Sequence, residues 1–287
     1  MSSKIVLITG CSTGIGHDLA WRLARANYTV VATARHPETL SDLPVALRLP
    51  LDVTDPISIA NATREVIRRF GRIDVLVNNA GYAIRGAVED IAIEQVQQMF
   101  DVNVYGVMRM TRAVVPYMRE QKAGRVITIG SLAGKLVLPV NGTYSATKFA
   151  LEALIDALRL ELAPFSIQVV LIEPGNIRSN FMATAQANSQ EILANPDSPY
   201  HALYQHYHVV MTTMRKQAPG PKIVSQAVQQ AIEASRPKAR YLVAVPFSQR
   251  VVLRLGDAVR DSIFRQMFKI GSGIGLNLRK VGRNTRL

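Results

Sequence analysis

Short apolar runs alternate with longer amphipathic segments along most of this chain of 287 residues. The apolar runs are rich in β-branched residues and lack the strict alternation of polar and apolar positions that a half-exposed strand shows. Such runs are typical of parallel strands that are buried on both faces of a sheet. We therefore expect strands at residues 4–9, 28–33, 46–50, 75–78, 125–129, 168–172 and 241–245.

Between the expected strands lie segments whose apolar residues recur at helical spacing. Because strands and helices alternate, right-handed crossovers should produce an α/β fold with a doubly wound parallel sheet of the Rossmann type. We expect a single domain of this kind over residues 1–246. Its helices should lie at about residues 15–26, 56–70, 93–122, 144–163 and 223–234.

Residues 180–222 break the alternation, because Asn, Gln, Pro and aromatic residues replace the β-branched runs. Ligands of open α/β sheets bind at the carboxyl ends of the strands, where such an insertion would lie. We therefore expect a lid over the substrate; the alternative is a surface segment that contacts no ligand. Its large side chains would either wall a cleft for a bulky lipophilic substrate or only pack together: Phe181, Met182, Tyr200, Tyr204, Tyr207, Met211 and Met214.

A glycine-rich loop with the sequence T-G-C-S-T-G-I-G, at residues 9–16, follows the first expected strand and opens the first expected helix. Glycines allow a tight turn there and let a pyrophosphate approach the N–H groups at the start of the helix. The loop therefore predicts that a dinucleotide cofactor binds through Gly10, Ser12, Thr13, Gly14, Ile15 and Gly16.

The end of the second expected strand indicates which dinucleotide binds. A carboxylate there would hydrogen-bond the adenosine ribose and repel a 2′-phosphate, but the sequence V-A-T-A is followed by Arg35 and contains no acid. Because Arg35 can form two hydrogen bonds with a 2′-phosphate and Ser12 can donate another, we expect NADP(H) to be preferred over NAD(H). Asp52, with Val53 after it, should meet the adenine amino group; alternatively, Asp52 only caps the helix that begins near Pro56.

The candidate chemistry lies where Tyr144 and Lys148 stand four residues apart, with Ser131 shortly upstream. One helical turn separates Tyr144 from Lys148, so the phenol and the ammonium share a helix face. A free phenol has a pKa near ~10, and a neighbouring cation favours the phenolate and lowers that pKa. A serine hydroxyl can hydrogen-bond the oxygen of a carbonyl or an alcohol. These residues predict proton transfer to or from a substrate oxygen.

Taken in order, these features resemble the short-chain dehydrogenase/reductase family over roughly residues 4–246. Five blocks carry the resemblance: the glycine loop, N-N-A-G at residues 78–81, Asn103, Ser131 with Tyr144 and Lys148, and P-G at residues 174–175. Residues 131–182 look most like the 17β-hydroxysteroid and retinol dehydrogenases. G-C-S in the glycine loop and the A-T-A-R that ends in Arg35 match the NADP-preferring members.

The resemblance implies roles for individual residues. Tyr144 would be the general acid in reduction and the base in oxidation, while Lys148 would lower the pKa of Tyr144 and bind the nicotinamide ribose. Ser131 would orient the substrate oxygen, and Asn103 would hold a water that links Lys148 to solvent. Hydride would pass directly between the nicotinamide and the substrate carbon, so no metal is needed. Further cofactor contacts would come from Asn79, Ala80 and Gly81 near the adenosine ribose and from Pro174, Gly175, Ile177 and Ser179 at the carboxamide.

The net charge of +13 is concentrated at the carboxyl end, where residues 236–287 carry 12 of the 34 basic residues but only 2 of the 21 acidic ones. We expect a basic amphipathic extension at residues 247–287, with a helix at residues 248–270. The apolar face of this helix would contact an anionic membrane surface, or it would cover the domain or a neighbouring subunit. No aromatic-basic platform accompanies the charge, so we expect no nucleic-acid binding. A single cysteine and the absence of a signal-peptide pattern predict a cytoplasmic protein, with peripheral membrane contact as an option.

We therefore expect an NADP(H)-dependent oxidoreductase that interconverts an alcohol and a ketone or aldehyde on a lipophilic small molecule of steroid, retinoid or fatty type. One alternative is a reductase of 3-oxoacyl thioesters, in which the basic tail attracts an acidic carrier protein. The alternative from another class is a non-catalytic nucleotide-binding scaffold. The family resemblance also implies a homodimer or homotetramer that pairs through the helices bearing Tyr144 and following Asn103.

Overall fold

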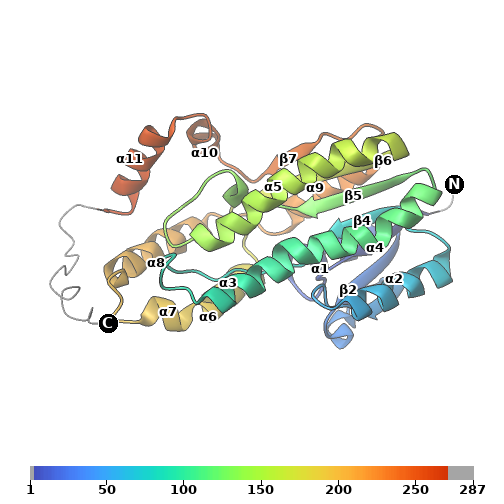
Figure 1. Cartoon of the computed structure of the whole chain (residues 1–287), viewed down its shortest axis with the longest axis horizontal. Coiled ribbons are helices and arrows are strands. Elements are labelled where there is room, and N and C mark those ends of the chain that lie inside the picture. The colour runs from blue at the N-terminus through green and yellow to red at the C-terminus, as the bar shows by residue number, and fades with distance from the viewer. Residues whose placement is uncertain (1–2, 271–287) are drawn as a thin grey trace, which may run out of the picture.

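The structure, a computed structural model, describes residues 3–270 and is built around a parallel sheet of seven strands. The strand order is β3-β2-β1-β4-β5-β6-β7, so the order reverses between β1 and β4 (Figure 1). Each strand lies within two residues of an expected one, and the predicted doubly wound α/β fold is confirmed. The strands are β1 (Ile5–Ile8), β2 (Thr29–Ala34), β3 (Leu47–Pro50), β4 (Val75–Asn78), β5 (Gly124–Ile129), β6 (Ile167–Pro174) and β7 (Arg240–Val243).

Helices cover both faces of the sheet and bury its β-branched side chains in two separate cores. One core lies under α1 (Gly14–Ala24) and α9 (Lys222–Glu233). The other core lies under α2 (Pro56–Phe70), α4 (Gly106–Glu120) and α5 (Gly142–Leu162). Burial on both faces explains why the strands read as continuous apolar runs. Short 3₁₀ turns occur at Pro37–Leu40, Leu132–Gly134 and Ala163–Phe165.

Local sequence signals fix where α2 begins and ends. Asp55 accepts a hydrogen bond from the backbone N–H of Ile57 at 2.8 Å, and Pro56 occupies the first helical position. Gly71 ends the helix with φ of 72°, a left-handed conformation that suits glycine. The predicted bounds of this helix are confirmed, but its cap is Asp55, and the alternative that Asp52 caps it is wrong.

The long helix expected at residues 93–122 is interrupted in its regular winding. It consists of α3 (Ile93–Phe100), a π-helical turn (Asp101–Tyr105) and α4. Such a turn inserts an extra residue into the helical ladder and often marks a functional position. Asn103 lies within it, so the turn determines how this side chain meets the neighbouring loop.

The segment at residues 180–222 forms α6 (Asn180–Asn188), α7 (Gln190–Ala194) and α8 (His201–Lys216) beyond the carboxyl end of the sheet (Figure 1). Two short helices follow β7: α10 (Phe247–Val252) and α11 (Asp257–Met267). Phe268, just after α11, is 2% exposed and stacks on Tyr207 of α8 with ring centroids 6.3 Å apart. The carboxyl extension therefore packs on the helices of the expected lid.

The single helix expected at residues 248–270 is wrong. Gly256 separates α10 from α11, because glycine is a poor residue for a helix interior, and its extended backbone starts the second helix instead. Residues 271–287 of the expected extension lie outside the described residues. Among residues 3–270, no helix is long and apolar enough to cross a membrane.

Candidate active site

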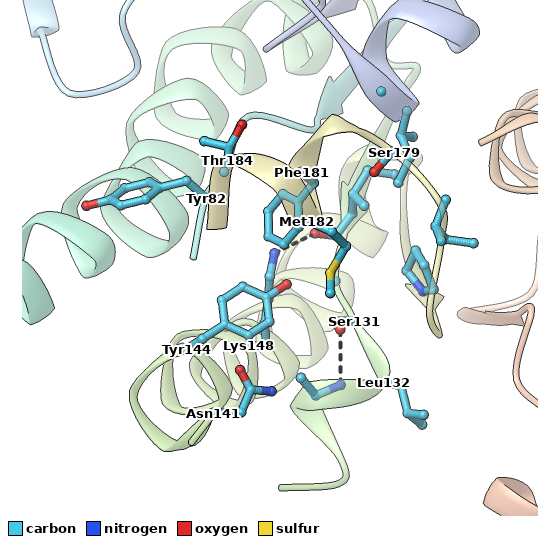
Figure 2. A pocket seen from close by; sticks show the side chains of 18 of the residues that line it. Tyr82, Ser131, Leu132, Asn141, Tyr144, Lys148, Ser179, Phe181, Met182 and Thr184 are labelled. Carbon is cyan, nitrogen blue, oxygen red and sulfur yellow. Dashed lines mark hydrogen bonds between the residues drawn. The ribbon is translucent and has the colours of Figure 1, made fainter. Parts of the chain in front are cut away.

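One cavity of about 1220 Å³ runs along the carboxyl ends of the strands, from the glycine loop to α8 and α11. All the predicted catalytic and cofactor residues line it except Gly16 and Asn103. Figure 2 shows side chains from α5, α6 and the loop after β5 around this space. The fold thus brings together residues that lie far apart in the sequence; their individual roles stay predictions.

The glycine loop is held by contacts that leave no room for larger side chains. Gly10 has φ of 70°, and a Cβ on it would lie 2.8 Å from Cα of Ala80. A Cβ on Gly16 would overlap the Gly10 carbonyl and the Asn79 amide, so Gly16 shapes the loop without lining the cavity. Asn79 donates to the carbonyls of Thr9 and Gly10 at 2.9 Å each. Asn79, predicted as a ribose neighbour, therefore also fixes the loop.

The start of α1 fits a bound pyrophosphate. No side chain caps this helix end, since Thr13 makes no cap hydrogen bond, and the first turn contains no acidic residue. Its N–H groups, together with the positive end of the helix dipole, are therefore available to an anion that Gly10 and Gly14 allow to come close. The cradle has the shape and polarity that a dinucleotide requires.

Arg35 and Asp52, which are predicted to meet the adenosine end of the cofactor, both line the cavity. Arg35 is exposed at the end of β2 and lines the cavity beside Ser12. Asp52 accepts hydrogen bonds from the backbone N–H of Thr54 at 2.8 Å and from its hydroxyl at 2.7 Å. These bonds hold the Asp52 carboxylate at the cavity wall rather than at the start of α2.

The catalytic candidates come from β5 and the first turns of α5. Ser131 follows β5, and its Oγ accepts a hydrogen bond from the backbone N–H of Ala133 at 3.1 Å. Lys148 is buried and donates from Nζ to the carbonyl of Ile129 at 3.0 Å. Tyr144 is also buried, with its ring centroid 5.8 Å from Nζ of Lys148 and 5.9 Å from the ring centroid of Phe181 (Figure 2).

Burial determines the direction in which the pKa of Tyr144 is shifted. Burial raises the pKa of the Tyr144 phenol, and the charge of Arg85 and a hydrogen bond from Ser131 only partly counteract this. Burial also lowers the pKa of Lys148 to about 8. Lys148 donates to Ile129 and is not among the groups that shift the Tyr144 pKa, so the expected lowering of this pKa by Lys148 stays a prediction.

Asn103 does not line the cavity but forms hydrogen bonds with residues next to it. Its amide donates to the Tyr82 carbonyl at 2.8 Å and to the Thr147 hydroxyl at 3.2 Å, while its oxygen accepts from the Tyr82 N–H at 3.0 Å. Thr147 in turn donates to the carbonyl of Tyr144 at 2.7 Å. The π-helical turn thus connects to the backbone of α5, and the water-holding role of Asn103 stays a prediction.

Two buried polar residues near Tyr144 were not found from the sequence. Arg85 is 7% exposed, lines the cavity and places Cζ 5.0 Å from the centroid of the Tyr144 ring. Asn141, just before α5, is 8% exposed and also lines the cavity. Neither belongs to a recognisable motif, and only the folded structure places them beside Tyr144.

The chain belongs to the short-chain dehydrogenases, because residues 4–190 match the short chain dehydrogenase family. It is therefore an oxidoreductase that uses a nicotinamide dinucleotide, and the scaffold alternative is set aside. It is similar to 17-beta-hydroxysteroid dehydrogenase type 1 of Homo sapiens, with 37% identity over 272 residues that cover 90% of this chain and 82% of that protein.

Two further comparisons agree with this assignment. The chain is 41% identical over 181 residues to 3-ketodihydrosphingosine reductase of Bacteroides thetaiotaomicron, covering 63% of this chain and 66% of that protein. Its structure is similar to the crystal structure of a short-chain dehydrogenase from Streptomyces avermitilis, with a TM-score of 0.71 and 30% identity over 93% of this chain and 96% of that one.

Proposed function

We propose that the protein catalyses NADP(H)-dependent interconversion of an alcohol and a ketone or aldehyde on a lipophilic small molecule. The observation that carries this proposal is the single cavity that joins the uncapped, glycine-lined start of α1 to Ser131, Tyr144 and Lys148. Nicotinamide dinucleotides supply a hydride when bound, and the residues at the other end of the cavity are equipped to supply the proton.

Tyr144 is suited to donate that proton. The phenol is protonated at neutral pH, because its ordinary pKa is about 10 and burial raises that pKa further. Carbonyl reduction is the direction in which a phenol must give up a proton, and the charge of Arg85 counteracts the rise and so favours this transfer. The Ser131 hydroxyl can hydrogen-bond the substrate oxygen and orient it toward Tyr144. Once the proton has moved, the positive charge of Arg85 stabilises the phenolate that remains.

The preference for NADP(H) rests on Arg35. An exposed guanidinium at the end of β2, with no acid beside it in A-T-A-R, can form a forked hydrogen bond with a 2′-phosphate. One neighbour in structure is a serine dehydrogenase complexed with NADP+, with 26% identity and a TM-score of 0.71 over 83% of this chain and 93% of that one.

The lipophilic substrate class rests on the walls beyond Tyr144. The cavity is lined there by apolar side chains from α6, α8, α10 and α11: Phe181, Met182, Met211, Met214, Val252, Ile263, Phe264 and Met267. We propose that α6 to α8 form the substrate lid and that the carboxyl extension completes it. Two similar proteins act, by their names, on steroids and on 3-ketodihydrosphingosine, which are both lipophilic ketones or their alcohols.

The pairing helices expected from the family expose apolar side chains that support a homodimer or homotetramer. Met108 on α4 is 41% exposed, and Phe149 and Leu160 on α5 are 44% and 74% exposed. A second copy that covered them would remove this surface from water. Light scattering coupled to gel filtration should give at least twice the mass of one chain, and a monomer at micromolar concentration would contradict this.

The proposed function is tested by two linked measurements on the purified protein. Fluorescence titration should show NADPH binding at least ~10-fold more tightly than NADH. Oxidation of NADPH should then be followed with free long-chain ketones and with the corresponding 3-oxoacyl thioesters. Turnover of the free ketones supports the proposal, turnover confined to thioesters favours the carrier-bound alternative, and turnover of neither contradicts both.

A further inference from the structure

Arg85 is a buried cation in the substrate part of the cavity, and the proposed chemistry uses it only as a positive charge near the Tyr144 phenolate. It lies in the loop between β4 and α3, and its backbone N–H donates to Oγ of Ser189 at 2.7 Å. Ser189 is itself fully buried and donates to the carbonyl of Ala185 at 2.6 Å. The lid thus fixes the backbone from which the Arg85 side chain reaches the cavity.

Within residues 3–270, the Arg85 guanidinium has no anionic partner. Its Nε is buried and makes no hydrogen bond, and no carboxylate forms an ion pair with it. The nearby acids are engaged elsewhere: Asp90 accepts from the hydroxyls of Ser198 and Tyr204, and Asp101 pairs with Arg109 at 2.6 Å. A guanidinium stays charged in proteins, so this site keeps a positive charge that the surrounding residues do not neutralise.

The contact with the Tyr144 ring does not account for this placement by itself. Arg119 makes a similar contact over Phe165 at 5.7 Å from an exposed position, where the guanidinium keeps its water. Arg85 makes its contact at 5.0 Å after losing most of its hydration. A cation over an aromatic face replaces lost hydration less completely than a carboxylate that forms two hydrogen bonds with the guanidinium.

A second unpartnered polar group lies beside Arg85. The backbone N–H of Gly86 donates to the carbonyl of Val140 at 3.0 Å, which joins the Arg85 loop to the residues just before α5. Asn141 follows Val140, and its amide oxygen is buried without a partner in the described part of the chain. Asn141 thus offers the cavity an unpartnered acceptor, and of these two side chains only the Arg85 guanidinium can attract an anion.

We propose that Arg85 binds a carboxylate of the substrate, so that the natural substrate is a lipophilic oxo acid or the corresponding hydroxy acid. This inference rests on the proposed function, and it adds the anionic group and its place near the reacting carbonyl. In reduction the carbonyl carbon accepts a hydride from NADPH and its oxygen accepts the proton of Tyr144. The carboxylate takes no part in bond changes and emerges intact in the hydroxy acid.

The activity test compares acids with their methyl esters, which have the same chain but no charge. The 2-, 3- and 4-oxo isomers of decanoic acid and of methyl decanoate would be assayed with wild type, Arg85→Gln and Arg85→Lys. In the wild type we expect one acid isomer to have a higher kcat/KM than its methyl ester. The ratio of these two kcat/KM values should fall about 100-fold in Arg85→Gln, mainly because KM for the acid rises. Arg85→Lys should retain part of the ratio because it keeps the charge and loses the fork.

Arg119→Gln is the matched control, since it removes a guanidinium from an aromatic ring outside the cavity and should leave the ratio unchanged. A ratio that Arg85→Gln does not alter, even with lower rates for both substrates, would show that Arg85 acts through Tyr144 and would overturn the carboxylate site. That outcome would leave the proposed function intact, because neutral ketones would still be reduced.

A binding measurement keeps the inference testable if no oxo compound is turned over. By calorimetry, decanoate should bind wild type at least ~10-fold more tightly than Arg85→Gln, while 1-decanol should bind both equally. Arg85-dependent decanoate binding without any carbonyl reduction would contradict the proposed function and support the site. Equal binding of decanoate to both proteins would overturn the site.

Discussion

In the half of the cavity formed by β1, α1 and β4, backbone atoms pack directly against backbone atoms, whereas in the half formed by α6, α8 and α11 aromatic side chains pack against one another. We call these the nucleotide half and the substrate half. Gly10 against Ala80 typifies the first, and Tyr207 against Phe268 typifies the second. The first contact depends on the absence of a side chain, and the second on the shape of two large ones.

This difference explains how much each half can vary in sequence while keeping its fold. A backbone contact tolerates only glycine, so the nucleotide half carries a sequence signature. An apolar wall tolerates many combinations of similar volume, so the substrate half carries none. The first half can therefore serve one cofactor while the second is adapted to a particular substrate.

The largest effect should come from Tyr144→Phe, at the border between the halves. Removing the phenol hydrogen should lower kcat by roughly 10²- to 10⁴-fold, because the substrate oxygen loses its proton donor. NADPH affinity, measured by fluorescence titration, should change little, since the glycine loop is intact. Retention of more than about a tenth of the activity would contradict the acid role. Tyr117→Phe, on α4 outside the cavity, is the matched control.

Gly16→Ala should disable the nucleotide half alone. The added methyl group would overlap the Gly10 carbonyl and the Asn79 amide, so the loop must shift. We expect a loss of about 1–3 kcal/mol in the free energy of unfolding and at least ~10-fold weaker NADPH binding. Gly220→Ala, where nothing lies within 4 Å of the new methyl, is the control. Equal behaviour of the two variants would refute the close-packing argument.

Arg35→Ala should change which dinucleotide the nucleotide half prefers. Losing a charge-assisted pair with the 2′-phosphate should weaken NADPH binding by about 10- to 100-fold, with NADH binding nearly unchanged. Titrations with both dinucleotides at one ionic strength would measure this. If both affinities fell together, the guanidinium would support the loop rather than read the phosphate.

Phe268→Ala should loosen the substrate half without reaching the nucleotide half. Phe268 is 2% exposed and stacks on Tyr207, so its loss opens the wall formed by α8 and α11. We expect KM for a lipophilic ketone to rise about 10-fold while NADPH affinity stays constant. Phe247→Ala, at a side chain that is 82% exposed, is the control. An unchanged KM would mean that the extension does not shape the substrate site.

The smallest effect on activity concerns Glu173, which lies near the end of β6 and does not line the cavity. Burial and the neighbouring Glu152 carboxylate raise its pKa from 4.5 to about 7, although Lys135 lies 3.2 Å away. The folded state therefore binds more protons than the unfolded state between these values, so Glu173 makes the protein less stable as pH rises from 4.5 to 7.

Glu173→Gln should remove this dependence. Its free energy of unfolding relative to wild type should increase by about 3 kcal/mol between pH 4.5 and pH 8, as measured by urea denaturation at each pH. Glu191→Gln, which removes an exposed carboxylate, should run parallel to wild type. If the free energy of unfolding of Glu173→Gln also changed with pH in parallel with wild type, Lys135 and Arg240 would already keep the Glu173 carboxylate ionised.

The sequence predicted the strands and the position of the glycine loop because these follow from local patterns: β-branched runs and glycines at a strand-to-helix turn. It did not predict Arg85 or Asn141, because two loops joined by one hydrogen bond from Gly86 to Val140 place them beside Tyr144. The sequence also did not predict that burial raises the pKa of Tyr144. Spacing along a helix indicates which groups are neighbours, but it does not show how deeply they are buried.

The central claim is that this cavity brings a hydride from the nucleotide and a proton from Tyr144 to the two ends of one carbonyl bond. The most direct test uses NADPH that carries deuterium at the transferring position, with mass spectrometry of the alcohol formed in a single turnover. We predict that the deuterium is found on the carbinol carbon of the product and that none is lost to water. Hydrogen from solvent on that carbon, with deuterium released into water, would contradict direct transfer.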